Sequence, residues 1–160
     1  MLFRSRGTIR NCSFTGSVNI EKAGKYPSVR LGGLVGYHSG ELSDCRVRAR
    51  MAVRGKDCNT KMGGIVATCG GTVRNCVFEG ELSVDIPLSN PNKPRALDLG
   101  GIIVQGRAMD CRSRFSVSLG EEARFSTLRM GGIAASIKEN NIENCLAEWT
   151  VSEEIGRAHV

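Results

Sequence analysis

A short sequence motif occurs five times along this chain of 160 residues, at nearly constant spacing. Each copy ends in Asn or Asp followed by Cys, and successive cysteines are 33, 31, 35 and 34 residues apart. These cysteines are Cys12, Cys45, Cys76, Cys111 and Cys145. A Gly-Gly pair between apolar residues alternates with them, at residues 32–33, 63–64, 100–101 and 131–132. A fixed period of this length is typical of folds in which similar units stack on one another.

Within each repeat, apolar and polar residues alternate after the cysteine. The residues at offsets +2, +4, +6 and +8 are mostly apolar, and those at odd offsets are mostly polar or charged. The +6 row consists of Val18, Met51, Leu82, Val117 and Val151. A period of two predicts β-strands with one buried face, which neighbouring repeats must cover. We therefore predict an all-β fold, a parallel β-helix (β-solenoid) that is right-handed and has about 4–5 coils of 31–35 residues.

The residue before each repeated cysteine forms a further row. It consists of Asn11, Asp44, Asn75, Asp110 and Asn144. Asn and Asp tolerate the left-handed backbone conformation and bond to nearby backbone groups, so we expect a bend at this point of every coil. Stacked Asn amides can also bond to one another along the axis of a solenoid.

The segments GGLVGYHSGELSDC (32–45) and GGIVATCGGTVRNC (63–76) resemble the GLUG motif of bacterial cell-surface repeat proteins. The resemblance covers residues 7–153, although Ala67, Val104 and Ala135 stand where Gly36 keeps the third glycine of the motif. It implies a structural or adhesive segment of a larger secreted protein, located outside the cell and flanked by further repeats. GLUG repeats also occur beside the protease domains of immunoglobulin-cleaving enzymes.

We expect one solenoid region over residues 1–154, cut through a repeat at both ends, because neither end completes the alternation of Cys and Gly-Gly elements. Residues 155–160, the string IGRAHV, are encoded by ATC GGA AGA GCA CAC GTC, which matches a sequencing adapter. We therefore expect this tail to be non-biological. No stretch of 18 apolar residues is present, so we expect no membrane insertion of this segment.

The net charge of +6 and the predominance of arginine raise the question of an anionic partner. The candidate binding residues are Arg30, Arg48, Lys56, Lys61, Arg114 and Arg129. Aromatic residues do not alternate with these basic residues, so we do not expect nucleic-acid binding. We interpret the basic stripes as solvated faces, with binding of an anionic glycan or of a host or cell-wall protein as the alternative.

Charges also alternate in sign along one row, at offset +3 from the cysteine. The row consists of Thr15, Arg48, Glu79, Arg114 and Glu148. On neighbouring strands this order predicts a ladder of exposed ion pairs, each contributing about 0.2–1 kcal/mol. The length variation falls in the segments 21–29, 54–60, 85–97 and 120–128, which we expect to be loops on one side of the solenoid and a candidate binding surface.

The seven cysteines contain no pair at the short spacing of zinc ligands, so we expect no metal and no cofactor. We expect a buried ladder of free thiols at the five repeated positions, with a disulfide between Cys58 and Cys69 left open. His38 is expected in a short turn, and Asp57 and Asp98 lie on no shared carboxylate row. We therefore predict that the segment is not an enzyme. The alternatives are a glycan-binding or glycan-active β-helix enzyme fragment, and a stalk module adjoining a secreted protease domain.

Overall fold

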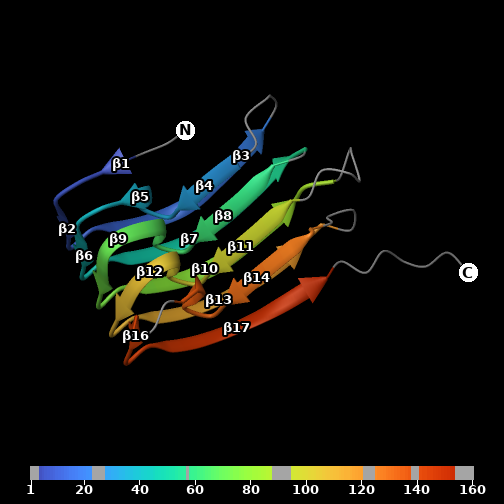
Figure 1. The fold of residues 1–160 in the computed structure, drawn as a ribbon. Coiled ribbons are helices and arrows are strands. Elements are labelled where there is room, and N and C mark those ends of the chain that lie inside the picture. Colours follow the sequence, from blue (N-terminus) through green and yellow to red (C-terminus); the bar gives the residue numbers. More distant parts are fainter. Residues whose placement is uncertain are drawn as a thin grey trace, which may run out of the picture.

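The computed structural model describes residues 4–22, 28–56, 58–87, 95–120, 125–137 and 141–153. In these ranges every regular element is a β-strand, and all the strand pairings that they contain are parallel. The strands belong to three sheets, and successive coils of the chain lie beside one another (Figure 1). The predicted β-solenoid is therefore confirmed. Residues 155–160, which we expect to be non-biological, lie outside the described residues.

Each coil contributes strands to sheets that we name A, B and C. Sheet B contains one long strand per coil, namely β3 (Ser13–Lys22), β7 (Arg46–Gly55), β10 (Val77–Asp85), β13 (Arg112–Leu119) and β17 (Leu146–Glu153). Sheet C follows in the chain and consists of β4 (Ser28–Gly32), β8 (Asn59–Gly63), β11 (Ala96–Gly100) and β14 (Thr127–Gly131). Sheet A contains β1 (Arg4–Ser5), β2 (Thr8–Arg10), β5 (Val35–His38), β6 (Glu41–Ser43), β9 (Val66–Arg74), β12 (Ile103–Met109), β15 (Ala134–Ser136) and β16 (Ile142–Glu143).

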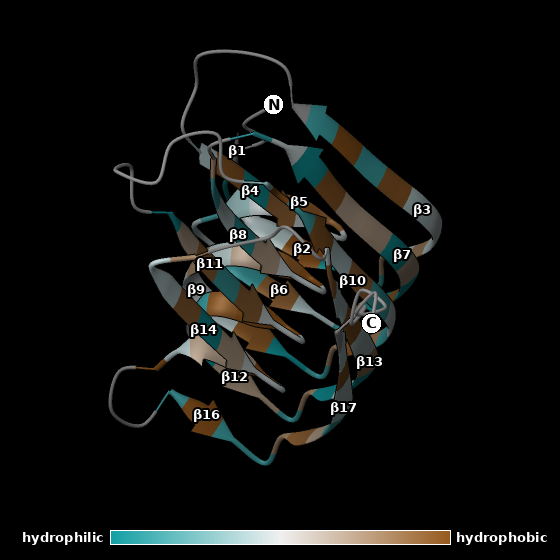
Figure 2. Ribbon diagram, turned by 90° about the vertical axis from the view of Figure 1, so that its right-hand side faces the viewer, coloured by the Kyte–Doolittle hydropathy of each residue, from teal (hydrophilic) through white to brown (hydrophobic). Residues whose placement is uncertain are grey.

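Equivalent residues of successive coils pair in register, as the repeat alignment predicts. In sheet B, Leu82 pairs with Met51 on one side and with Val117 on the other. All three side chains are at most 1% exposed, whereas Val151, at the same offset in the last coil, is 43% exposed. The brown and teal bands that alternate along β3 and β7 display the same period of two (Figure 2). Inward rows therefore build one continuous core, which is incompletely covered where the last coil has a single neighbour.

The Asn and Asp residues before the cysteines form the predicted bends. Their φ angles lie in the left-handed region, at 54° for Asn11, 56° for Asp44, 49° for Asn75, 55° for Asp110 and 50° for Asn144. The side chains also bond along the axis: Asn75 Nδ2 donates to Asp44 Oδ1 at 2.7 Å, and Asn144 Nδ2 donates to Asp110 Oδ1 at 3.3 Å. Both the bend and the axial bonds are thus confirmed.

The Gly-Gly pairs lie at the corner between sheets C and A, where the first glycine of each pair is the last residue of a sheet C strand. Strand β8 ends at Gly63, and Gly64 occupies the bend before β9. A Cβ atom on Gly64 would collide with the carbonyl oxygen of Gly101 and with the ring of Phe78. Close approach of neighbouring backbones therefore requires glycine here.

We predict that Gly64→Ala destabilises the solenoid by about 3 kcal/mol or more, because the colliding carbonyl is backbone and has no rotamer to change. Gly70→Ala is the matched control, since its nearest new neighbour would be the Cα of Ser39 at 3.6 Å, an ordinary contact. Its effect should be within about 0.5 kcal/mol. Urea unfolding followed by circular dichroism measures both variants, and equal midpoints would contradict the packing described for this corner.

Candidate functional site

The outer face of sheet B carries charge that changes sign from strand to strand. Outward positions of β7 and β13 include arginines, and those of β10 and β17 include glutamates. The residues concerned are Arg46, Arg48 and Arg50 on β7, Glu79 and Glu81 on β10, Arg112 and Arg114 on β13, and Glu148 on β17. We call this surface the charged face. It is the largest regular arrangement of ionisable side chains in the described residues.

Neighbouring strands of the charged face are joined by ion pairs, so the predicted +3 ladder is confirmed. Arg48 donates to Glu79 Oε2 from Nη2 at 2.6 Å and from Nε at 2.9 Å. Arg114 Nε donates to Glu148 Oε2 at 2.8 Å. A further pair, Arg50 with Glu81 at 3.7 Å, lies two residues along the strands.

Two shallow hollows adjoin one another on the charged face. One, of about 650 Å³, lies over Arg114, Glu148 and Trp149, and the other, of about 470 Å³, lies over Thr15 and Arg50. They share the residues Arg48, Glu79, Gly80 and Ser116, so they form one open groove that crosses the strands. Gly16 and Gly80 lie among the residues that line the groove. It can hold an extended polymer but does not enclose a small molecule.

The structure does not bring the six basic residues singled out from the sequence into one site. Arg48 and Arg114 lie on the charged face. Arg30, Lys61 and Arg129 lie on sheet C, whose apolar side chains share a core with those of sheet B, so the two outer faces point away from each other. Lys56 is exposed in the segment that follows β7. Residues 23–27, 57, 88–94 and 121–124 belong to the four variable loops and lie outside the described residues.

The basic row of sheet C contains one buried acidic residue. Asp98 of β11 is only 4% exposed and lies between Lys61 and Arg129. Its carboxylate oxygens are 3.9 Å from Lys61 Nζ and 3.7 Å from Arg129 Nη1. The acidic residue is therefore covered by the two cations beside it, which removes part of their charge from the surface.

Two carboxylates are held in the ionised form by neighbours on the adjacent coil. The hydrogen bonds from the Arg48 guanidinium lower the pKa of Glu79 below its ordinary value. The amide of Asn75, and then Ser43, lower the pKa of Asp44 in the same way. A carboxylate whose pKa is lowered by folding stabilises the folded state above its unfolded pKa. That contribution disappears as the pH falls through the folded pKa.

We predict that the solenoid loses stability on acidification below about pH 5, and that Glu79→Gln and Asp44→Asn each reduce this loss. At neutral pH both variants should be slightly less stable than the parent chain. Thermal melting across an acidic pH series measures the effect. Parallel pH profiles for the parent chain and both variants would show that these bonds are not formed in solution.

The five repeated cysteines form a ladder of free thiols, and Cys58 and Cys69 are free as well. The thiols of Cys45, Cys76, Cys111 and Cys145 bond to the carbonyl two residues earlier at 3.0–3.2 Å. Burial raises the pKa of the Cys45, Cys69 and Cys145 thiols, which keeps them protonated. The prediction of a buried ladder is confirmed at Cys45, Cys76 and Cys111, but Cys145 is only partly buried and Cys12 is exposed, so the prediction is wrong at Cys12.

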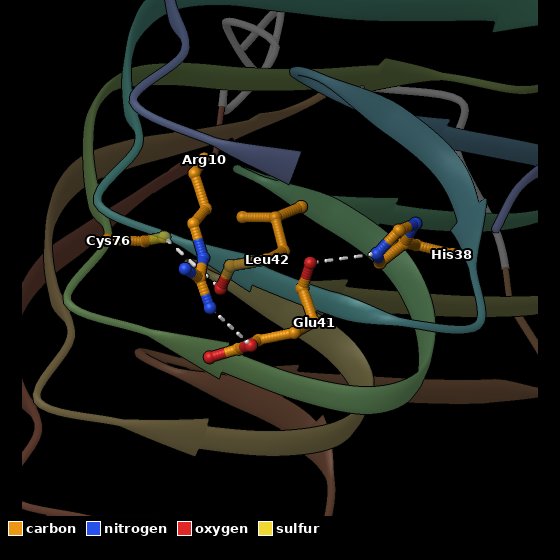
Figure 3. A network of polar contacts seen from close by, with 5 residues as sticks. All are labelled: Arg10, His38, Glu41, Leu42 and Cys76. Carbon is orange, nitrogen blue, oxygen red and sulfur yellow. Dashed lines mark hydrogen bonds and ion pairs between the residues drawn. The ribbon is translucent and has the colours of Figure 1, made fainter. Parts of the chain in front are cut away.

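His38 is the last residue of strand β5 and does not lie in the short turn expected from the sequence, and its side chain is completely buried. Figure 3 shows its surroundings, where His38 Nε2 lies 3.2 Å from the carbonyl oxygen of Glu41 and Arg10 contacts the Glu41 carboxylate at 2.9 Å. The thiol of Cys76 approaches the Leu42 carbonyl at 4.0 Å (Figure 3). His38 borders none of the hollows of the charged face. This network joins coils and offers no nucleophile to a ligand.

Among the described residues, no three His, Cys, Asp or Glu side chains are grouped as metal ligands would be. A helix long and apolar enough to cross a membrane is likewise absent from the part of the chain that the structure describes. A third hollow, of about 500 Å³, lies over Tyr37, Thr68 and Gln105 of sheet A, beside the irregular pairing of β12. The sequence analysis missed it, since no repeated signal marks this irregularity.

The sequence analysis also missed the diagonal pairs Arg10 with Glu41 and Arg107 with Glu143, at 2.9 and 3.2 Å. The two residues of each pair lie at different distances from their own cysteines, so a comparison of residues at the same offset does not reveal the pair. The pair Arg50 with Glu81 does share an offset, and the alignment that gave the +3 ladder contains the signal for it. In comparisons with known proteins, no family model, no curated protein and no solved structure matches this chain.

Proposed function

We propose that this chain is a non-catalytic structural or adhesive repeat segment of a larger secreted bacterial surface protein, of the kind that carries GLUG motifs. One observation carries the proposal: the outward charges of each coil are used to bind the next coil. Arg48 is paired with Glu79, and Arg114 with Glu148. A surface arranged in this way supports a long, regular stack of repeats, as a stalk requires.

The same pairing disfavours acid–base chemistry in the groove. A glycosidase needs one carboxyl group that can stay protonated near its working pH, beside a second one that is ionised. Arg48 lowers the pKa of Glu79, the opposite of what a general acid needs. Glu79 and Glu148 lie on strands separated by β13, and each is bound to an arginine.

The groove favours a second candidate function, the binding of an anionic glycan. It is open and crosses several strands, and its lining includes arginine side chains and the hydroxyl groups of Thr15 and Ser116. Guanidinium groups suit a sugar polymer with carboxylate or sulfate substituents.

The proposed location is tested with antibodies raised against the recombinant chain and applied to bacteria that carry the parent gene. We expect labelling of intact cells, and release of peptides from this segment by brief protease treatment. Labelling only after permeabilisation would overturn the proposal. Hydrolysis of a polysaccharide panel, followed by new reducing ends, should remain at background, and sustained turnover would favour the enzyme alternative.

Glycan binding is measured with chondroitin sulfate and polygalacturonate by calorimetry. If the groove binds them, Arg114→Ala should weaken binding several-fold, whereas Arg129→Ala on sheet C serves as the matched control and should leave it unchanged. No heat of binding from either polymer would exclude this candidate for the groove. Equal effects of the two substitutions would indicate attraction by net charge alone.

A further inference from the structure

We propose that the hollow on sheet A binds an uncharged sugar. The hollow has a volume of about 500 Å³ and is more enclosed than the groove of the charged face. It lies over strands β9 and β12, each of which pairs with neighbouring strands on both sides. The site is therefore formed inside the stack of coils and does not depend on either end of the chain. It also lies on a different sheet from the candidate groove for an anionic glycan, so each proposal can fail without the other.

The hollow lies where one coil takes a shorter path across sheet A. In the coil of β12, Cys111 follows Gly101 by 10 positions, whereas in the coil of β9, Cys76 follows Gly64 by 12 positions. The same interval is 12 positions in the coil that contains β5 and 13 positions in the coil that contains β15. The coil of β12 is thus at least two residues shorter than its neighbours. A short coil between longer ones leaves an indentation at the surface of the stack.

The register of β9 and β12 shows where the two residues are missing. Gln105 pairs with Thr68, and the pairing resumes between Arg107 and Thr72 after a shift of register. Gly106 alone therefore spans a distance for which β9 uses three residues. A Cβ atom on Gly106 would lie 2.6 Å from a backbone oxygen of β9, so the short coil passes close against its neighbour. The segment at Gly106 forms the floor of the hollow, and β9 forms one wall. Irregular pairings of this kind are over-represented beside active sites.

The lining of the hollow offers hydrogen bonds but no free charge. Thr68 and Thr72 contribute hydroxyl groups, and Gln105 contributes a side-chain amide. Among the described residues, no Asp or Glu lines the hollow, and its one cation, Arg107, is already bound to Glu143 at 3.2 Å. Such a surface suits a ligand whose polar groups are neutral hydroxyls, because each hydroxyl both donates and accepts hydrogen bonds.

Tyr37 contributes the one aromatic ring of the described lining. It lies on β5 in register with Thr68, and its hydroxyl would be 3.9 Å from a Cβ atom on Gly70. The ring therefore stands beside a part of β9 that has no side chain. Tyrosine combines an apolar ring with a polar tip. A sugar has the same combination, since its C–H face is apolar and its edges carry hydroxyl groups.

Thr68 carries a polar group that the fold does not use. Its hydroxyl oxygen is buried and forms no hydrogen bond within the part of the chain that the structure describes. Thr68 lies in register between Tyr37 and Gln105. Gln105 is exposed, so a change of its rotamer can open the hydroxyl to a ligand. A sugar hydroxyl would supply the missing hydrogen bond, which no group of the chain competes for.

The site is mapped by nuclear magnetic resonance titration of the isotope-labelled chain with cellobiose, maltose and di-N-acetylchitobiose. We expect the amide signals of Gly70, Gly71 and Gly106 to shift and saturate with at least one of these uncharged disaccharides. Digalacturonate is the charged counterpart and should shift them less at equal concentration. The absence of shifts at these glycines with all three neutral sugars would overturn the proposal. A larger effect of digalacturonate would overturn it as well.

A single substitution tests the hydroxyl group. Thr68→Val replaces it with a methyl group of similar shape and should weaken sugar binding about two- to tenfold. The unfolding midpoint should stay the same or rise, because no hydrogen bond within the described chain is lost. Thr127→Val on sheet C is the matched control, since it makes the same change at a partly exposed strand position outside the hollow and should leave binding unchanged. Equal affinities of the parent chain and Thr68→Val would contradict the proposed site.

The length of the short coil gives a test that depends on no single side chain. Insertion of Ser-Gly between Gln105 and Gly106 restores the interval found in the coil of β9, so the hollow should fill and sugar binding should be lost. Circular dichroism should remain that of the parent chain, because the neighbouring coil accommodates the same number of residues here. The same insertion after Pro87, in a variable loop, is the control and should leave binding intact. Binding that survives the insertion at Gly106 in a folded chain would show that the sugar is held elsewhere.

Discussion

The parallel pairing of equivalent residues on successive coils is the interaction on which the rest of this structure depends. A single coil has strands of two to ten residues and cannot bury its own inward row. Once Leu82 pairs between Met51 and Val117, all three become fully covered, and each buried side chain of this size contributes about 1.5–3 kcal/mol. The exposed ion pairs contribute less individually. The inward rows therefore hold the coils together, and every other feature either permits this stacking or makes use of it.

The corners of each coil make this stacking in register possible. Coils stack in register only if each one turns at the same place, and a left-handed residue before every cysteine fixes one of these places. Asn75 and Asp44 show why this residue type suits the position, since the side chains that tolerate the conformation also bond to each other along the axis. At the corner between sheets C and A the requirement is different. The bend brings Gly64 against Gly101 and Phe78, so space alone excludes a side chain.

The sequence predicts most of this because each repeat is an independent copy of the same constraint. Five aligned copies of the repeat identify the inward faces, the left-handed bends and the Arg48–Glu79 and Arg114–Glu148 pairs. What it does not predict depends on the path of one coil in three dimensions. Glycine inside a strand and glycine just beyond its end look alike in a sequence, so the sequence does not show that Gly64 lies at a corner. The burial of His38 and Asp98 and the presence of the groove likewise depend on how the sheets turn relative to each other.

The alternation of charge from strand to strand explains how a chain with an excess of arginine can pack its strands closely. The chain carries a net charge of +6, and β7 alone presents Arg46, Arg48 and Arg50 on one face. Two such strands at the spacing of a sheet would repel each other. The acidic strand β10 separates β7 from β13, so each arginine row meets glutamates and the dense stacking of a basic chain becomes possible. The last strand, β17, again carries an acid, Glu148, and its outer side has no arginine row among the described residues. The order of basic and acidic strands therefore lets successive coils of a chain with excess arginine pair in register without placing like charges on neighbouring strands.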